Sequence, residues 1–224
     1  MRTHHVYLYA VIPRTHDGDY IPRGILDLPV SLCSQGDLSA AISLVPTDAE
    51  PDDPPAHERV MKRLLRHSSV LPAPVPTILS SASALHELLA QKQQLMRGEL
   101  QRLEGLIEVR LHVTARRAEA APPAETAERD YLLARLSTAL RSSGFCSRQL
   151  PSRHPENMLR LACLLHAAFF EPFMLTCESL KRNLGPAREL LVSGPMAPVD
   201  FISRSVFSGL EIHQASSAGA ARAA

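Results

Sequence analysis

The residues best suited to chemistry in this chain are its 4 cysteines and 10 histidines. The cysteines are far apart and form no C-x-x-C pair, which indicates reduced thiols in a cytoplasmic protein. No H-x3-H or H-E-x-x-H spacing occurs, and zinc needs three or four converging ligands. The adjacent His4 and His5 are therefore expected to be solvated, and the sequence predicts no metal site. The cysteines are Cys33, Cys146, Cys163 and Cys177.

The chain also lacks the sequence patterns that are usual for nucleophilic catalysis and for phosphate binding. Cys163 and His166 lie on one predicted strand, but a separation of three residues places them on opposite faces. The chain contains no G-x-S-x-G elbow, no G-x-G-x-x-G loop and no G-x-x-x-x-G-K-[ST] loop. We therefore expect a protein that is not an enzyme and that binds no cofactor.

Composition and charge argue against several other broad classes. The 224 residues carry 24 Lys+Arg and 23 Asp+Glu, a balance that argues against a dedicated nucleic-acid binder. Aromatic residues make up 4% and tryptophan is absent, so platforms for stacking bases are scarce. Charged residues and a proline interrupt the longest apolar stretch, residues 159–175, which therefore predicts no membrane span. A hydrophobic fraction of 45% predicts a buried core.

The first half of the chain predicts an α+β domain with the order β-β-β-α-extended-α. Asp53 is expected to cap the first helix and Ser81 or Ser83 the second, a long helix that Gly105 ends. Between the helices, three prolines in residues 70–79 favour an extended segment that is a poor edge for strand pairing. The expected strands are residues 6–12, 30–34 and 38–45, with a hairpin turn at 35–37.

The second half predicts the order β-α-β-β-α-β, which is typical of a ferredoxin-like sandwich. Its clearest strand, residues 107–113, alternates apolar side chains with Glu108, Arg110 and His112, so one face is expected in the core and the other is polar. The fold class is thus α+β with two domains. The expected boundaries are residues 1–105, 106–213 with the tail segment included, and a disordered tail at 214–224.

Five segments follow a family pattern in the expected order: YLYAV at residues 7–11, HERV at 57–60, VLPAPVPT at 70–77, IEV at 107–109 and GPMAPVDF at 194–201. They are similar to "YLYGIV", "HE.V", "vLPvRFGT", "EWgVkV" and "GPWPPYSF" of the gas vesicle accessory proteins, the GvpF/GvpL family. The chain resembles a divergent member, because "RFG" is replaced by Pro74-Val75-Pro76 and the last motif has Met196 and Val199 in place of its tryptophan and tyrosine.

The resemblance implies a non-enzymatic role in building gas vesicles, as a minor structural component or an assembly factor. It also implies contact with the shell protein GvpA and with other accessory proteins, in the cytoplasm and on gas vesicles. Shell subunits expose apolar surface before assembly, and an accessory protein that covers this surface would prevent aggregation. The rival interpretation is a ferredoxin-like small-molecule-binding regulatory or catalytic module, which would need a deep pocket with convergent polar groups.

Two proline-containing segments are the candidate contact regions. Residues 70–79 present a side-chain surface for a partner or, as the favoured alternative, connect the domains. Residues 194–201 contact a partner or, more simply, hold the tail across the two domains through the aromatic ring at position 201. The candidate contact residues are Leu71, Pro72, Val75, Thr77, Gly194, Pro195, Pro198 and Phe201.

Overall fold

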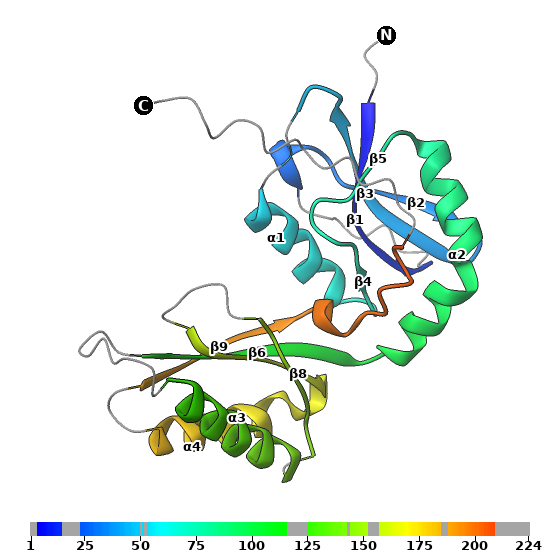
Figure 1. The fold of residues 1–224 in the computed structure, drawn as a ribbon. Helices are drawn as coiled ribbons and strands as arrows, with labels where there is room; N and C mark the ends of the chain where they lie inside the picture. The colour runs from blue at the N-terminus through cyan, green and yellow to red at the C-terminus, as the bar shows by residue number, and fades with distance from the viewer. Residues whose placement is uncertain are drawn as a thin grey trace, which may run out of the picture. The chain divides into compact units, whose positions relative to one another are not determined.

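The computed structural model describes residues 4–14, 23–49, 51, 53–115, 125–142, 144–151, 157–184 and 188–208 (Figure 1). The expected disordered tail at 214–224 lies outside these residues. Contacts divide the chain into two compact units, Met1–Glu104 with Ile202–Ala224, and Gly105–Phe201. The expected second domain, residues 106–213, included residues 202–208, which the contacts group with the first unit instead.

An antiparallel sheet around one buried strand forms the centre of the first unit. This central strand, β1 (His4–Pro13), is paired with β3 (Leu38–Pro46), and β2 (Ser31–Gln35) lies at the edge beyond β3. Residues 6–12 are all buried, as their run of β-branched and aromatic side chains predicts. Gly36 has a φ of +60° in the tight turn between β2 and β3, where glycine avoids the steric cost of the left-handed region.

The proline-containing segment completes this sheet, which differs from the expectation of a poor pairing edge. Two short strands, β4 (Leu71–Pro72) and β5 (Ile78–Leu79), both pair antiparallel with β1. Ala73 N donates to Tyr9 O at 2.9 Å, so pairing with β1 extends past β4, and the prolines at 74 and 76 interrupt the ladder without preventing pairing at either end. Leu8 N also donates to Thr77 O at 2.9 Å, next to β5.

Two helices pack against this sheet, and both begin where the sequence predicts. Asp53 caps α1 (Pro54–Leu65) by accepting a hydrogen bond from Ala56 N at 3.0 Å. Ser81 caps α2 (Ala82–Arg102), because its hydroxyl accepts from Ala84 N at 3.2 Å. Gly105, at φ +68°, follows the end of α2, as expected for a glycine that terminates a helix.

Loss of the Ser81 cap is expected to weaken the first unit. Ser81→Ala leaves Ala84 N without its side-chain acceptor, so the free energy of unfolding should fall by about 1 kcal/mol. Ser83→Ala is a matched control, because it removes only an exposed hydrogen bond to Glu87 and should change stability by less than about 0.5 kcal/mol. Urea unfolding followed by circular dichroism measures both, and equal effects would contradict the capping role.

The segment after residue 201 packs on α2 within the first unit. The carboxylate of Glu99 accepts hydrogen bonds from Ser203 N at 3.2 Å and Ser203 Oγ at 3.0 Å. It also accepts from the Arg102 guanidinium at 2.7 Å, and this contact is the main reason that the pKa of Glu99 lies below its ordinary value. Val206 and Phe207 are buried. These contacts explain why the segment groups with the first unit.

The second unit has the expected ferredoxin-like topology. Its strands are β6 (Leu106–Ala115), β7 (Cys146–Gln149), β8 (Asn157–His166) and β9 (Arg188–Met196), in the sheet order β7-β8-β6-β9 with every pair antiparallel. The helices α3 (Glu125–Ser142) and α4 (Phe170–Asn183) cover one face of the sheet (Figure 1). The core includes the apolar face of β6 with Leu136 of α3 and Phe173 of α4.

Three short 3-10 helices complete the described chain. The first, η1 (Ile25–Asp27), precedes β2 in the first unit. In the second unit, η2 (Ala167–Phe169) leads into α4, and η3 (Val199–Phe201) follows β9. The last of these carries residues of the predicted C-terminal motif.

Candidate functional site

The alternation of polar and apolar residues in β6 suggests that its polar face is exposed to solvent. In the structure this face is instead largely covered. Glu108 has an exposed fraction of 0%, and Arg110 and His112 are half-buried. The segment that follows β9 covers this face through the contact of Asp200 with Glu108, so the polar side chain of Glu108 is buried. Burial of a carboxyl group is costly unless it has partners, and Glu108 has several.

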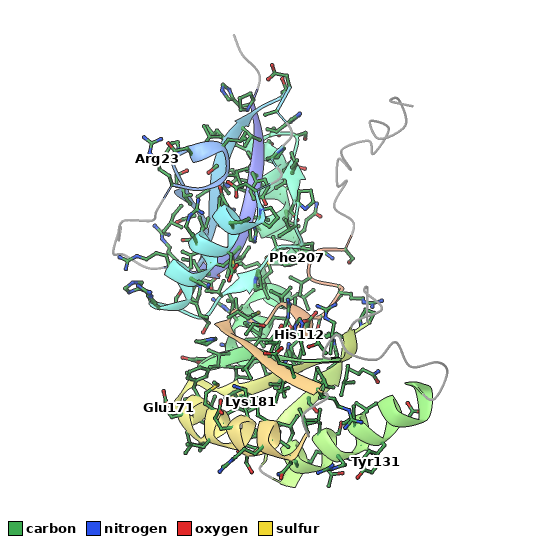
Figure 2. The ribbon with its side chains drawn as sticks, turned by 90° about the vertical axis from the view of Figure 1, so that its left-hand side faces the viewer. Arg23, His112, Tyr131, Glu171, Lys181 and Phe207 are labelled. Carbon is green, nitrogen blue, oxygen red and sulfur yellow. The ribbon has the colours of Figure 1, made fainter. Side chains whose placement is uncertain are left out.

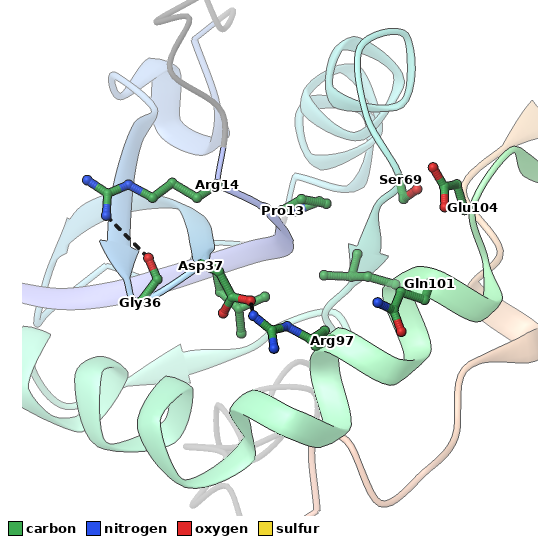
Figure 3. Close-up of a pocket in the computed structure, with 10 residues that line it drawn as sticks. Pro13, Arg14, Gly36, Asp37, Ser69, Arg97, Gln101 and Glu104 are labelled. Carbon is green, nitrogen blue, oxygen red and sulfur yellow. Dashed lines mark hydrogen bonds and ion pairs between the residues drawn. The ribbon is translucent and has the colours of Figure 1, made fainter.

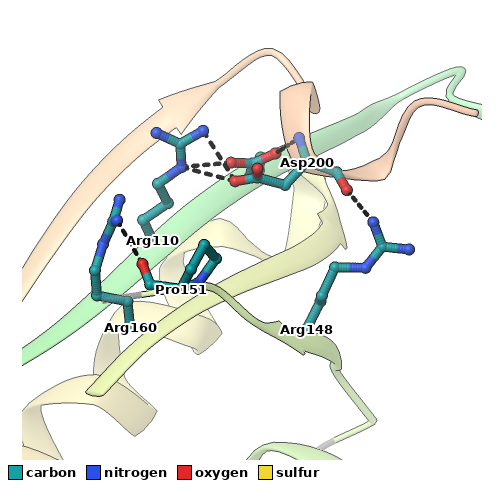
Figure 4. Close-up of polar contacts among 6 residues, drawn as sticks. Arg110, Arg148, Pro151, Arg160 and Asp200 are labelled. Carbon is teal, nitrogen blue, oxygen red and sulfur yellow. Dashed lines mark hydrogen bonds and ion pairs between the residues drawn. The ribbon is translucent and has the colours of Figure 1, made fainter. Parts of the chain in front are cut away.

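Glu108 belongs to a polar cluster that joins β6, β7 and η3, and Figure 4 shows Arg110, Arg148 and Asp200 of this cluster. Its Oε1 accepts from Arg110 Nε at 2.7 Å, and its Oε2 accepts from the backbone Asp200 N at 2.8 Å. Arg110 Nη2 pairs with Asp200 Oδ2 at 2.9 Å. From β7, Arg148 donates to the carbonyl oxygen of Asp200 and lies 5.5 Å from the ring centre of Phe201. We call these residues the η3 clasp.

The electrostatics of the η3 clasp are dominated by the burial of Glu108. Desolvation raises the pKa of Glu108 from 4.5 to about 7, although Asp200 N and the Arg110 guanidinium lower it. The nearby Asp200 carboxylate raises this pKa further, because two like charges resist joint ionisation. His112, on the same face of β6, has a pKa lowered by burial and then by Arg160 and Arg110. Desolvation of Glu108 therefore outweighs the Arg110 cation and shifts this carboxyl toward its protonated form.

Most of the predicted C-terminal contact residues lie in or beside this clasp. Gly194 has a φ of +134°, and a Cβ there would lie 2.9 Å from the carbonyl oxygen of Glu108. This approach falls at a register shift between β6 and β9, and Pro195 follows on the same strand. Pro198 is buried, and Phe201 is half-buried against Arg148. These contacts hold η3 on the sheet of its own unit.

The other predicted contact residues lie in the first unit, and most are buried there. Leu71 and Thr77 have exposed fractions of 0% and 1%, and Pro72 is buried in β4. The Thr77 hydroxyl donates to the carbonyl oxygen of Pro74, which holds the turn between the short strands. Val75 alone among these four presents a largely exposed side chain, at 51%. The structure thus leaves Val75 as the residue of this set that is available to a partner.

A groove of about 630 Å³ lies in the first unit beside the turn between β2 and β3 (Figure 3). Arg97 of α2 pairs with Asp37 at the turn, and Arg14 donates to the carbonyl oxygen of Gly36 at 3.2 Å. Leu100 contributes an apolar wall. Glu104 adds a carboxylate to the lining, so the groove offers a surface of mixed charged and apolar character.

A second groove, of about 470 Å³, lies between α3 and α4 in the second unit. It is lined by apolar side chains such as Leu136 and Leu180 together with Arg135, whose guanidinium carbon lies 5.5 Å from the ring centre of Tyr131. Tyr131 forms one wall, is 58% exposed and lies on the outer side of α3 (Figure 2). We call this surface the α3–α4 groove. The sequence did not indicate it, because helix spacing alone does not show how two helices meet.

Chemistry by a bound metal ion has no support in the described part of the chain. Within those residues, no group of three or more histidine, cysteine or acidic side chains converges. Nor does any described helix have the length and apolar character needed to span a bilayer. The described residues instead offer two grooves, which are suited to contact with other molecules, and a buried ionic clasp, which holds η3 on its sheet.

The fold and these surfaces define a two-unit α+β protein whose second unit is a ferredoxin-like sandwich. The chain belongs to the GvpL/GvpF family, because the family model described as gas vesicle synthesis protein GvpL/GvpF matches residues 5–144. The fold is shared with the gas vesicle protein GvpF from Anabaena sp. PCC7120, at a TM-score of 0.78 and 13% identity, with 90% of this chain and 97% of that chain covered. The structure of GvpF from Microcystis aeruginosa matches with a TM-score of 0.75 and 13% identity, and the match covers 89% of this chain and 99% of that chain. Among curated proteins, no significant match was found.

These comparisons confirm the family resemblance and the α+β fold class that the sequence predicted. Pro74-Val75-Pro76, which stands in place of "RFG", lies between β4 and β5, and both of these strands pair with β1. This departure from the family pattern therefore falls between two paired segments of the chain.

Proposed function

We propose that this chain is a gas vesicle accessory protein that contacts the hydrophobic shell protein GvpA during vesicle formation, as a minor structural component or an assembly factor. The observation that carries the proposal is membership of the gas vesicle family across residues 5–144. The action is by contact and not by catalysis, in the cytoplasm and on the forming vesicle. Other gas vesicle accessory proteins are the second class of partner.

The physical basis of the proposal is the shielding of apolar surface. A subunit that will line a gas-filled space exposes large apolar patches before it joins the wall, and such patches aggregate in water. A partner with an apolar groove and a polar surround covers the patch while remaining hydrated. In the second unit the α3–α4 groove has this character, and Val75 adds an exposed apolar side chain in the first unit.

Co-expression with GvpA tests the proposal directly. We expect the chain to raise the amount of soluble GvpA and to co-purify with it. Unchanged solubility together with no co-purification would contradict the shielding role. Fractionation of purified vesicles then separates the two forms of the proposal, because a structural component stays with the vesicle and an assembly factor does not.

Three variants locate the contact surface. Tyr131→Glu places a charge on the wall of the α3–α4 groove, and Val75→Glu does the same in the first unit. Gln94→Glu, at an exposed position of α2, is the control for added charge. A surface that binds GvpA should lose at least tenfold in affinity on charge insertion, since a buried unpaired charge costs several kcal/mol. Equal binding by all three variants would exclude both surfaces.

A further inference from the structure

Three side chains of the first unit form a relay that the sequence did not reveal. Cys33 and Gln35 are two residues apart on the edge strand β2, so both point to the same face of the sheet. His86, one turn into α2, lies over them. Its Nε2 is 3.5 Å from Cys33 Sγ, and its Nδ1 is 3.1 Å from Gln35 Oε1.

The hydrogen bonds of the relay determine where its protons lie. The amide oxygen Gln35 Oε1 can only accept, so His86 Nδ1 carries the proton of the neutral imidazole. His86 Nε2 is then an unprotonated acceptor, and the thiol proton of Cys33 points at it. A nucleophile, a base and a group that orients the base are therefore in line, which is the arrangement that activates a cysteine.

We propose that Cys33 is a modification site that reacts with low-molecular-weight disulfides, with His86 as its base and Gln35 as the positioning residue for His86. His86 Nε2 takes the proton from Cys33, and Sγ attacks one sulfur of the disulfide. The S–S bond of the disulfide breaks as the new Sγ–S bond forms. The departing thiolate takes the proton back from His86, so the products are a mixed disulfide at Cys33 and one free thiol. The step is stoichiometric and does not depend on the gas vesicle role.

The other three cysteines provide comparisons within the same molecule. Cys163 and Cys177 are buried, and burial raises the pKa of each thiol to about 12, so both are expected to be unreactive. Cys146 is exposed. Cys33 is half-buried, and burial raises the pKa of its thiol. Exposure alone therefore predicts that Cys146 reacts first, whereas the contact of Cys33 with His86 predicts the reverse order.

The experiment is a reaction of the full chain with 4,4′-dithiodipyridine, with the rate at each cysteine followed by peptide mass spectrometry. At pH 7 we expect Cys33 to react at least about tenfold faster than Cys146, because general-base assistance of about 100-fold or more is partly offset by the lower exposure of Cys33. A Cys33 rate no higher than that of Cys146 would overturn the proposal.

Variants at His86 and Gln35 separate activation from simple packing. His86→Gln keeps a polar side chain over Cys33 but removes the base, so the Cys33 rate should fall about tenfold while the Cys146 rate stays constant. Gln35→Leu should reduce the rate less, because the imidazole can then carry its proton on either nitrogen and only one of these two tautomers accepts from Cys33. If His86 only covers the thiol, its replacement would expose Cys33 and increase the rate, and that result would also overturn the proposal.

Discussion

Glu108→Gln should remove about 3 kcal/mol of pH dependence from the stability of the protein between pH 5 and pH 8. The pKa of Glu108 rises from 4.5 in a solvated chain to about 7 in the folded protein, and each pKa unit corresponds to about 1.4 kcal/mol. A glutamine fills the same space and does not titrate. The measured quantity is the free energy of urea unfolding of wild type and variant at pH 5 and at pH 8.

The sign of this effect follows from proton binding. Between pH 4.5 and about 7 the folded state holds the Glu108 proton and the unfolded state has released it. The contribution of Glu108 to stability is therefore fully present below pH 4.5 and is lost as pH rises through 7. If the Arg110 ion pair instead dominated and kept Glu108 charged, the contribution would grow with pH, and that outcome would contradict our account.

The titration of His57 also changes stability with pH, so the effect of Glu108 must be measured as a difference between wild type and variant. This buried histidine hydrogen-bonds to Tyr7 at 3.0 Å, and burial lowers its pKa from 6.5 to about 4. The unfolded state then binds more protons between pH 4 and 6.5, so this contribution to stability is lost as pH falls through 4. The two titrations oppose each other in the wild-type curve. Subtracting the pH dependence of the Glu108→Gln variant from that of the wild type cancels the contribution of His57, because His57 is unchanged in the variant.

Gly194→Ala should destabilise the second unit by about 3 kcal/mol. The φ of +134° at Gly194 is accessible to glycine and strained for alanine, and the added Cβ would lie 2.9 Å from the backbone oxygen of Glu108. Backbone cannot move aside as a flexible side chain would, so β9 must shift away from β6 and the η3 clasp with it. Urea unfolding measures the loss, and faster hydrogen exchange in β6 and β9 should locate it.

A second glycine supplies the control for Gly194→Ala. Gly98 lies within α2, and nothing lies within 4 Å of the position that its Cβ would take. Gly98→Ala should therefore stabilise the protein by about 0.5–1 kcal/mol, because alanine favours the helix. Opposite signs for the same chemical change are the expected result. A small effect of Gly194→Ala would show that the junction of β9 and η3 tolerates rearrangement.

Local patterns of the sequence were sufficient to predict most of the secondary structure and the topology of the second unit. The alternation in β6, the caps at Asp53 and Ser81, and the glycine at 105 each depend on neighbouring residues, and the structure contains all of them. The order of elements in the second half allows few topologies, so it predicted the ferredoxin-like sheet before any contact was known. The motifs between residue 7 and residue 201 were sufficient to identify the family.

Contacts between distant residues decided the remainder. Glu108 is polar and lies on the polar face of β6, yet the backbone of Asp200, 92 residues further on, buries it and gives it a partner. Thr77 and its neighbours form an interrupted strand because β1 offers them a free edge. Cys33 and His86 meet across 53 residues. Secondary structure is determined over a few residues, whereas burial, pKa and proximity depend on which segments the folded chain brings together.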